Sequence, residues 1–262
     1  MPEVSVIMAA YNAEEYIMES INSIINQDFQ NFEIIICDDA STDSTWEKIS
    51  YAMELDKRVI GIRNDNNLKA AATRNNCLSI AKGNYVAIQD SDDISEPERL
   101  SRQLKTLKEN PNYTYVGTGM YLFDSKGTWK KTTPIEYPKK TDYLKGAPYA
   151  HGTTMFKKSA LLSVGGYRVA KETQRGQDAD LLMRLYSNGF IGRNLLDYLY
   201  GYRVDGQTLK RRKFKFRYHS FLNRYKNYKE MGLMPIGIIY AVKPLIGGLI
   251  PRTLMYKMRK RK

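Results

Sequence analysis

Cysteine is scarce in this sequence, and the two cysteines among its 262 residues exclude a disulfide-rich fold. Cys37 and Cys77 both lie in apolar segments, so we expect buried free thiols and a reducing cytoplasm. The chain begins Met1, Pro2, Glu3 and then enters a short apolar run, with no basic stretch followed by a long apolar segment. We therefore expect no secretory signal.

Long apolar runs are also missing. The most apolar stretch near the C-terminus, residues 235–250, is interrupted by Lys243 and Pro244. It is shorter than the roughly 20 apolar residues that a spanning helix needs. The sequence therefore predicts no membrane span.

Glycine-rich phosphate loops are absent after the predicted strands. No G-x-G-x-x-G follows any of them, which disfavours a NAD-dependent dehydrogenase. The loop after the first strand reads Ala10, Tyr11, Asn12, Ala13, whereas a nucleotidyltransferase is expected to carry glycines with Arg or Lys there. A nucleotidyltransferase is therefore kept only as an alternative.

Acidic residues are nearly absent from the C-terminal segment. Residues 208–262 contain 16 Lys or Arg and one acid, Glu230, so their net charge is +15. Because the whole chain has a net charge of +13, the remaining residues carry about −2. A segment this cationic favours a polyanionic partner, either an anionic membrane surface or a nucleic acid.

Apolar runs rich in β-branched residues alternate with amphipathic segments in the first half of the chain. Residues 41–43 offer helix-capping side chains, and Pro97 suits the first turn of a helix. The predicted strands are 4–9, 32–37, 58–63 and 85–89, and the predicted helices are 13–25, 44–55, 69–81 and 97–108. This alternation predicts a mostly parallel α/β sheet with helices on both faces, which binds ligands beyond the carboxyl ends of its strands.

The pattern changes after residue 110. Strands are expected at 115–123, 128–132 and 153–156, helices at 159–163 and 177–187, and a turn at Gly165 and Gly166. The body, residues 1–206, therefore divides near residue 110; that it is a catalytic domain with a nucleotide-binding half, 1–110, and an acceptor half, 111–206, is what the family resemblance of its motifs implies. Residues 207–262 form a basic, aromatic-rich helical tail.

An acidic cluster, Asp90, Ser91, Asp92, Asp93, follows a predicted buried strand. Three carboxylates so close together repel one another unless a cation lies between them. Carboxylates are hard oxygen ligands, which suit Mg²⁺ or Mn²⁺ bridged to substrate phosphates. The alternative is helix capping ahead of Pro97, but capping needs only one of these side chains, so a metal site is favoured.

Two further polar positions allow more than one interpretation. Asp39 follows the second strand and can accept hydrogen bonds from a base or ribose, or it can lie solvated beside a helix cap. Arg74 lies among small residues at 70–76 and suits bidentate contact with phosphate. The ordinary alternative for Arg74 is a surface arginine on a helix.

These pieces occur together and in order, and the chain resembles glycosyltransferase family 2, whose members have the A-type glycosyltransferase fold. The matching segments read VSVIMAAYNAEEYIMESINSIINQDFQNFEIIICDDASTDST at 4–45, AAATRNNCLSIAKGNYVAIQDSDD at 70–93, HGTTMFKKSALLSVGGYR at 151–168 and GQDADLLMRL at 176–185. The resemblance covers residues 3–205. It implies a Rossmann-like nucleotide-binding sheet and a transferase that uses a nucleotide-sugar.

The resemblance also implies roles for donor-side residues. Asp39 is similar to the residue that contacts uracil in members that use UDP-sugars, and Arg74 to a contact on the nucleotide or phosphate. In the D-x-D pair, Asp90 matches the ribose side and Asp92 the ligand of Mn²⁺ or Mg²⁺. The remaining donor-side positions, from the nucleotide loop and the acidic cluster, are Ala9, Ala10, Tyr11 and Ser91.

On the acceptor side, Asp178 matches the general base of the family's Glu-Asp motif. Gln177 departs from that motif, because it replaces the glutamate that precedes the base, and acceptor contacts are expected to differ here. His151, one of two histidines, is a candidate for the metal shell or the acceptor, and a hydrogen-bonded loop histidine is the ordinary alternative. Without the resemblance, the preferred interpretation of Asp178 is a negative charge that interacts with the N-terminus of a helix.

Three interpretations of the tail are open: a membrane-surface segment, a nucleic-acid-binding segment, and a helical appendage packed on the body. We rank the membrane surface first, because the apolar residues 235–250 serve no purpose in binding nucleic acid. This predicts a cytoplasmic enzyme peripheral to the inner face of the cell membrane, with a glycan or polyprenyl-diphosphate-linked acceptor, in bacterial polysaccharide or O-antigen assembly. A non-catalytic sugar-nucleotide-binding protein at the membrane surface is the remaining alternative.

Overall fold

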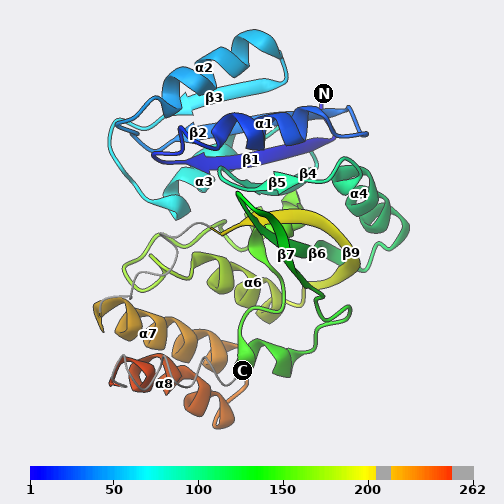
Figure 1. The fold of residues 1–262 in the computed structure, drawn as a ribbon. Helices are drawn as coiled ribbons and strands as arrows, with labels where there is room; N and C mark the ends of the chain where they lie inside the picture. The colour runs from blue at the N-terminus through cyan, green and yellow to red at the C-terminus, as the bar shows by residue number, and fades with distance from the viewer. Residues whose placement is uncertain (205–213, 250–262) are drawn as a thin grey trace.

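The N-terminal part of the sheet consists of four parallel strands (Figure 1). The structure, a computed structural model, describes residues 1–204 and 214–249. β1 (Val4–Ala10) pairs with β2 (Phe32–Asp38) and with β4 (Tyr85–Asp90), and β3 (Val59–Arg63) pairs with β2 at the edge. Every residue of β2 is buried, as expected of a parallel strand that is covered on both faces.

Helices cover both faces of these strands. α1 (Ile17–Ile25) and α2 (Thr45–Leu55) contribute to the apolar cluster on one face, and α3 (Ala70–Ile80) contributes to the cluster on the other. Cys37 and Cys77 are both buried free thiols in the α3-side cluster, as the sequence predicted. The predicted α/β layering of the first half is therefore confirmed.

The sheet continues into the second half of the chain with mixed strand directions. β8 (Met155–Lys157) lies antiparallel between β4 and β6 (Tyr113–Asp124). β9 (Ile191–Arg203) runs parallel to β6, and β5 (Ile94–Ser95) and β7 (Gly127–Thr132) pair antiparallel with β9 and β6. The nine strands form one sheet, ordered β3-β2-β1-β4-β8-β6-β9-β5 with β7 beside β6.

Five helices lie between β5 and β9 in the chain, and two of them, η2 and α6, bring side chains to the edge of the sheet. Their bounds are α4 (Arg99–Glu109), η1 (Lys140–Lys145), η2 (His151–Thr153), α5 (Lys158–Ser163) and α6 (Gln177–Ser187). Gly165 and Gly166 have φ of 72° and 64°, so the turn predicted after α5 is present. α6 has the bounds that its leucine spacing predicted.

Several predicted boundaries were wrong. The helix expected from residue 13 begins at Ile17, because residues 13–16 form a turn, and the helix expected from Pro97 begins at Arg99. The strand expected at 153–156 is shorter and later, because His151–Thr153 forms a 3-10 turn. The long strand β9 was missed altogether, since Gly192, Asn194, Asp197 and Gly201 interrupt its apolar pattern with weak strand formers.

The described part of the tail forms two helices that pack on the body. α7 (Phe214–Glu230) lies against α6, and α8 (Ile236–Leu249) lies against α7 as the outermost element at that end of the molecule (Figure 1). Tyr228, Met231 and Ala241 are buried in the same apolar cluster as α6. The helical appendage is therefore the correct description of residues 214–249; the expected domain boundary at 206/207 and the basic end at 252–262 lie outside the described residues.

No helix in the described ranges is both long enough and apolar enough to cross a bilayer.

Candidate active site

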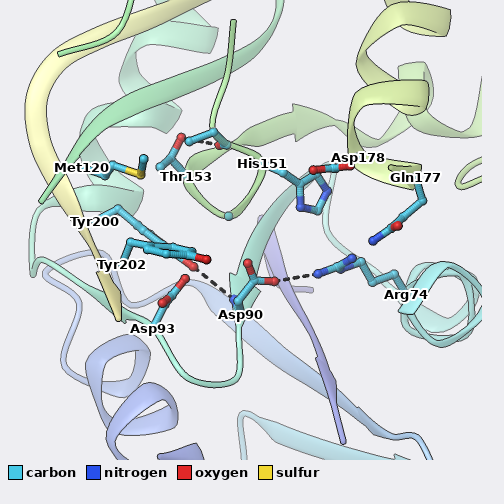
Figure 2. A pocket seen from close by; sticks show the side chains of 12 residues that line it. Arg74, Asp90, Asp93, Met120, His151, Thr153, Gln177, Asp178, Tyr200 and Tyr202 are labelled. Carbon is cyan, nitrogen blue, oxygen red and sulfur yellow. Dashed lines mark hydrogen bonds and ion pairs between the residues drawn. The ribbon is translucent and has the colours of Figure 1, made fainter. Parts of the chain in front are cut away.

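A cavity of about 330 Å³ opens beyond the carboxyl end of β4, where the two parts of the sheet meet (Figure 2). This is the position at which open α/β sheets bind ligands. Its walls come from α3, η2, the first turn of α6, β6 and β9. The lining residues are Arg74, Asp90, Asp93, Met120, Ala150, His151, Gly152, Thr153, Gln177, Asp178, Tyr200 and Tyr202.

An ion pair between α3 and β4 forms one wall of the cavity. The Arg74 guanidinium donates through Nη2 to Asp90 Oδ1 at 2.6 Å. Arg74 is only 7% exposed, so the interpretation of this residue as a surface arginine was wrong. Its Nε and Nη1 are buried and have no hydrogen-bond partner within the described ranges. Because buried unpaired donors are costly, these two groups suit an anionic ligand in the cavity.

The charges of this pair are mutually stabilised. Burial raises the pKa of Asp90, but the charge of Arg74 outweighs it and holds the pKa below its ordinary value. Burial lowers the pKa of Arg74, and the carboxylate of Asp90 more than restores it. Asp90 also donates its backbone N–H to Tyr200 Oη at 3.2 Å, so residues of α3 and β9 both hold it.

The residues after Asp90 face in different directions. Asp93 is buried, and its Oδ1 accepts the backbone N–H of Arg203 at 2.8 Å. Burial, followed by repulsion from Asp90 and Asp92, raises the pKa of Asp93 to about 8. Asp92 is exposed and lies outside the cavity lining, as does the half-buried Ser91. The cluster that the sequence suggested is therefore divided between the cavity wall and its rim.

Arg203, the last residue of β9, holds this acidic loop. Its Nε donates to the carbonyl of Asp92 at 2.8 Å, and its guanidinium pairs with Glu19 of α1. The same guanidinium lies 4.2 Å from the ring centroid of Tyr16 and 4.5 Å from that of Phe123. Two cation–π contacts and three polar contacts fix the loop conformation.

The carboxylate oxygens of this loop suit a divalent cation whose coordination is completed by a bound ligand. Within residues 1–204 and 214–249, no three acidic, histidine or cysteine side chains form a ready-made metal cage. Mg²⁺ and Mn²⁺ sites commonly use only one or two carboxylates together with substrate phosphates, and need no such cage. Asp92 offers an exposed carboxylate, and the buried Oδ2 of Asp93 has no hydrogen-bond partner among the residues that the structure describes. Hard oxygen ligands are therefore present at the rim.

Asp178 and Gln177 form the first turn of α6 on the opposite wall. In Figure 2 the Asp178 side chain lies beside His151, and Gln177 lies above Arg74. Asp178 is half-buried and lies in the first turn of α6. A half-buried carboxylate that faces a cavity can accept a proton from a ligand hydroxyl.

His151 is held in the same wall by Tyr167. Its Nε2 lies 2.8 Å from Tyr167 Oη. The tautomer of the imidazole determines which of these two atoms donates the hydrogen bond. Burial, followed by the charge of Arg74, lowers the pKa of His151 to about 4, so the imidazole is neutral near pH 7. The hydrogen-bonded loop histidine is therefore present, and the same ring also lines the cavity.

The loops after β1 and β2 lie at the same edge of the sheet but outside this cavity. Asp39 is 4% exposed, and its carboxylate accepts the backbone N–H groups of Leu68 and Lys69 at 2.8 and 2.9 Å and Asn64 Nδ2 at 2.9 Å. Asp39 therefore orders the chain that leads into α3. Leu68 and Lys69 line a second cavity, of about 340 Å³.

The other residues of these loops differ in exposure. Ala10 is buried and Ala9 is partly exposed, whereas the Tyr11 ring is 49% exposed at the loop tip. Asp43, rather than Ser41 or Thr42, accepts the backbone N–H of Thr45 at the start of α2. Ser41 instead accepts the N–H of Asn12, which joins the two loops.

The sequence did not identify the residues of β6 and β9 that complete the cavity. Met120, Tyr200 and Tyr202 line it, and Arg203 holds its rim. Tyr200 is buried, and Gly152 permits its approach, because a Cβ at position 152 would lie 2.5 Å from Tyr200 Oη. No local signal marks these residues, since their roles depend on pairings with distant segments.

Comparisons with known proteins agree with this geometry. The model of the family described as glycosyl transferase family 2 matches residues 5–165. The putative glycosyltransferase EpsE of Bacillus subtilis is 40% identical over 262 residues, covering 100% of this chain and 94% of that protein. The Escherichia coli enzyme WfaP, named as a UDP-Glc:alpha-D-GlcNAc-diphosphoundecaprenol beta-1,3-glucosyltransferase, is 33% identical over 266 residues, covering 99% of each.

Two solved structures share the fold. S. aureus TarS 1–349 in complex with UDP matches with a TM-score of 0.69 and 21% identity, covering 94% of this chain and 70% of that one. The mannosyltransferase PcManGT of Pyrobaculum calidifontis, in complex with GDP-Man and Mn²⁺, matches with a TM-score of 0.67 and 19% identity, covering 99% and 79%. The predicted A-type fold is therefore confirmed.

Proposed function

The chain belongs to glycosyl transferase family 2 and is a glycosyltransferase, and from that premise we propose that it transfers one sugar, with inversion, from a UDP-sugar to a hydroxyl of a lipid-linked glycan. Family membership sets aside the nucleotidyltransferase and the non-catalytic binding protein. Bacterial polysaccharide assembly, including O-antigen synthesis, is the proposed setting, because relatives of this chain carry such names.

One observation carries this proposal. The carboxylate of Asp178, at the N-terminus of α6, lines the same cavity as the Arg74–Asp90 pair. A transferase needs a base for the acceptor hydroxyl and a cation for the departing diphosphate. The opposite walls of the cavity provide one of each.

The proposed reaction conserves atoms and charge as follows. The acceptor oxygen forms a bond to the anomeric carbon while the bond between that carbon and the diphosphate oxygen breaks. The acceptor proton passes to Asp178, a step that contributes about 10²–10⁴-fold to the rate. The electron pair of the broken bond stays on UDP, where the unpaired Nε–H and Nη1–H of Arg74 stabilise the charge.

Asp92 is the proposed ligand of Mn²⁺ or Mg²⁺, with His151 as a further candidate. When bound, the ion supplies Lewis-acid stabilisation of the diphosphate. The exposed carboxylate of Asp92 and the unpartnered Oδ2 of Asp93 support this assignment. The backbone of Asp92 is set by Arg203, so the carboxylate is presented from a fixed loop.

The nucleotide is proposed to bind at the loops after β1 and β2. Tyr11 offers an exposed ring for a base to pack on. The Asp39 carboxylate already accepts three hydrogen bonds, and the proposed contact with the base is a fourth. Ala9, Ala10, Ser91 and Asp90 complete the path from the base to the ribose. UDP is favoured because TarS was solved with UDP and with UDP-GlcNAc, and the name of WfaP specifies UDP-Glc.

The acceptor is proposed to enter from the side of β6 and β9. Gln177 and His151 face the cavity beside the base and are the proposed acceptor contacts. Met120 and Tyr202 add an apolar and aromatic wall on which a sugar ring can pack. A polyprenyl-diphosphate-linked sugar is favoured because the name of WfaP specifies a diphosphoundecaprenol acceptor.

A lipid-linked acceptor places the enzyme at a membrane, and α8 carries the proposed contact. Ile236, Ile239 and Ile246 are 59%, 64% and 54% exposed and lie, with the exposed Lys243, at spacings of three and four residues. Such spacing puts them on one helical face. Apolar side chains among cations suit the interface of an anionic membrane. The proposed location is the cytoplasmic face of the cell membrane, through residues 208–262.

Vesicle flotation with the full chain tests this contact. Truncation before α7 would remove buried core residues, so point variants are needed. The double substitution Ile236→Ser and Ile239→Ser is expected to reduce flotation with vesicles containing phosphatidylglycerol. The control is Tyr51→Ser and Leu55→Ser, equally exposed residues of α2. Equal flotation of the two double variants contradicts the membrane contact, and RNA binding that competes with vesicles favours the nucleic-acid interpretation.

A donor screen tests the proposed function itself. We expect UDP-glucose or UDP-N-acetylglucosamine to raise the melting temperature with Mn²⁺ present, and GDP- and dTDP-sugars to have little effect. Asp92→Ala should remove the dependence on Mn²⁺ while leaving the melting temperature of the free protein nearly unchanged. Stabilisation by a GDP-sugar, or equal stabilisation without the ion, contradicts the donor assignment.

A further inference from the structure

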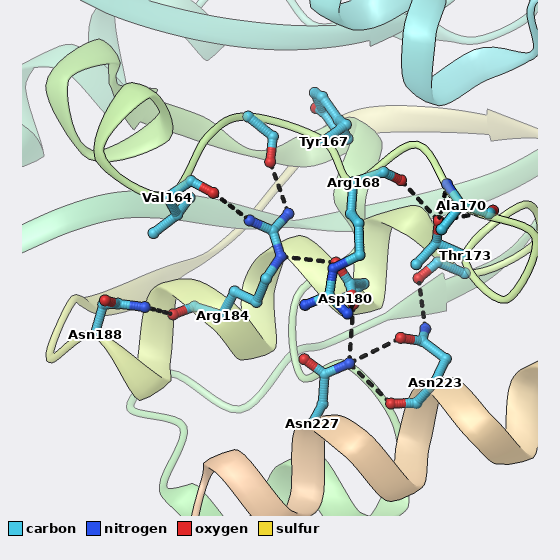
Figure 3. Close-up of polar contacts among 12 residues, drawn as sticks. Val164, Tyr167, Arg168, Ala170, Thr173, Asp180, Arg184, Asn188, Asn223 and Asn227 are labelled. Atoms are coloured by element: carbon cyan, nitrogen blue, oxygen red, sulfur yellow. Dashed lines mark hydrogen bonds and ion pairs between the residues drawn. The ribbon is translucent and has the colours of Figure 1, made fainter.

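A buried polar cluster outside the cavity joins α7 to the helix that carries Asp178 (Figure 3). Asp180 lies at its centre, two residues after Asp178, and is fully buried. Its carboxylate accepts hydrogen bonds from Arg184 Nε at 2.7 Å and from Asn227 Nδ2 at 2.9 Å. Arg168 Nη1 lies 3.5 Å from the same carboxylate. The cluster thus compensates a buried charge with two cations and one amide.

Arg184 joins α6 to the turn that precedes it. Arg184 donates to the carbonyl of Val164 at 2.5 Å and to that of Gly166 at 2.6 Å. Together with its bond to Asp180, these contacts use all three nitrogens of the Arg184 guanidinium. The middle of α6 is therefore held by residues of the same catalytic body.

The N-terminal turn of α6 is held differently, by α7. Asn223 Nδ2 donates to the carbonyl of Gly176 at 3.2 Å, and Gly176 is the N-cap of α6 with φ of 157°. Asn227 Nδ2 lies within 2.8 Å of both the carbonyl and Oδ1 of Asn223, so the two amides support each other. Hydrogen bonds from α7 thus reach residues 176 and 180, on either side of Asp178.

We infer that Asn223 and Asn227 of α7 are positioning residues for Asp178, an assignment that rests on the proposed role of Asp178 as the base. The bonds act at the two ends of the turn that carries the carboxylate, at Gly176 and Asp180. A hydrogen bond to a buried charge is stronger than an ordinary one, so loss of the Asn227 amide shifts this turn rather than a distant loop. Displacement of a reacting group by about 1 Å costs on the order of 10²-fold in rate.

The competing explanation is that these amides only attach α7 to the body. Other contacts already do so, because Tyr228, Met231 and Leu233 are buried against the main apolar cluster. Tyr228 Oη also donates to the carbonyl of Tyr143 at 3.1 Å. A merely structural role therefore predicts lower stability with unchanged turnover by each folded molecule, whereas positioning predicts slower turnover in molecules that still bind donor.

The experiment counts binding sites and turnover separately. Asn227→Ala and Asn223→Ala are compared with Glu230→Ala, an exposed position on the same helix. UDP titration by calorimetry with Mn²⁺ gives the number of competent sites and the Kd. Release of UDP from UDP-glucose, with a synthetic N-acetylglucosaminyl-diphospho-lipid in detergent as acceptor, gives kcat for each site. Asn223→Ala retains the bond between residues 227 and 180, and so tests the inference if Asn227→Ala folds poorly.

We expect both alanine variants to keep the UDP Kd within about twofold and to lose about tenfold or more in kcat for each site. The acid limb of their pH–rate profiles should also move, because the surroundings of Asp178 change, whereas Glu230→Ala should match the wild type. Unchanged kcat for each site in both variants overturns the inference, whatever their stability. A wild-type protein that binds no UDP or shows no turnover contradicts the proposed function itself and removes the basis of this inference.

Discussion

Arg74 and Asp90 form a 2.6 Å ion pair, and within the described part of the chain the arginine Nε and Nη1 have no hydrogen-bond partner. The pair joins α3 to the carboxyl end of β4, so it combines a rigid position with an unused binding capacity. A structural ion pair would be expected to satisfy its donors when buried. The arginine is therefore prepared for a further anion, and the diphosphate of a donor is the anion that the family uses.

Arg74→Lys is predicted to weaken donor binding. Lysine keeps the charge beside Asp90 but has no planar fork to contact a phosphate while it holds the carboxylate. We expect kcat/KM for the donor to fall by about 10²-fold and the UDP Kd to rise in calorimetry. Arg102→Lys, on the exposed face of α4, serves as the matched control. A wild-type Kd for Arg74→Lys would show that this residue does not contact phosphate.

Arg203→Met is predicted to raise the concentration of Mn²⁺ needed for half-maximal activity by several-fold. The substitution keeps an unbranched side chain between the rings of Tyr16 and Phe123 but loses the bond to the carbonyl of Asp92 and the pair with Glu19. The acidic loop then presents Asp92 less uniformly. A metal titration of the initial rate measures this, with Arg203→Lys expected to be intermediate. An unchanged metal requirement argues against the role assigned to this loop.

Asp56 gives a prediction about the pH dependence of stability. Its hydrogen bonds with Arg58, at 2.6 to 3.2 Å, lower its pKa below 3.8. A carboxyl whose pKa falls on folding stabilises the folded state above its unfolded pKa and loses that contribution as the pH falls through the folded value. Asp56→Asn should therefore be less stable by about 1 kcal/mol at pH 7, allowing for partial exposure, and equal to the wild type near pH 2. Urea unfolding at pH 7, 4 and 2 measures the difference; one that persists at pH 2 has another cause.

Much of the first half was predictable because its signals are local. The apolar runs that became β1 and β2 predicted buried parallel strands, and the polar residues that follow each strand lie at one edge of the sheet. The Asp178 position followed from a helix start that the spacing of leucines predicts. Local sequence does not distinguish a surface from a buried side chain for Arg74, which is buried because it pairs with Asp90 in the folded chain.

The rest depends on contacts that no local pattern contains. β9 was missed because its glycines and polar residues interrupt the alternation, yet it supplies Tyr200 and Arg203 to the site. The contact between Asn227 and Asp180 joins residues 47 positions apart, and composition alone marked Asn227 only as part of a basic tail. Buried polar side chains on a charged helix are the signal that would have identified a packed helix.

In the proposed mechanism, Asp178 is the base of the sugar transfer and takes no part in holding the donor. The most direct test is the Asp178→Asn variant, which keeps the size of the side chain and removes its capacity to accept a proton. Calorimetry with UDP and Mn²⁺ and single-turnover transfer from UDP-glucose are measured on the same preparation. We predict an unchanged UDP Kd and a transfer rate lower by about 10²–10⁴-fold. A transfer rate within a few-fold of the wild type, in protein that binds UDP normally, would contradict the assignment.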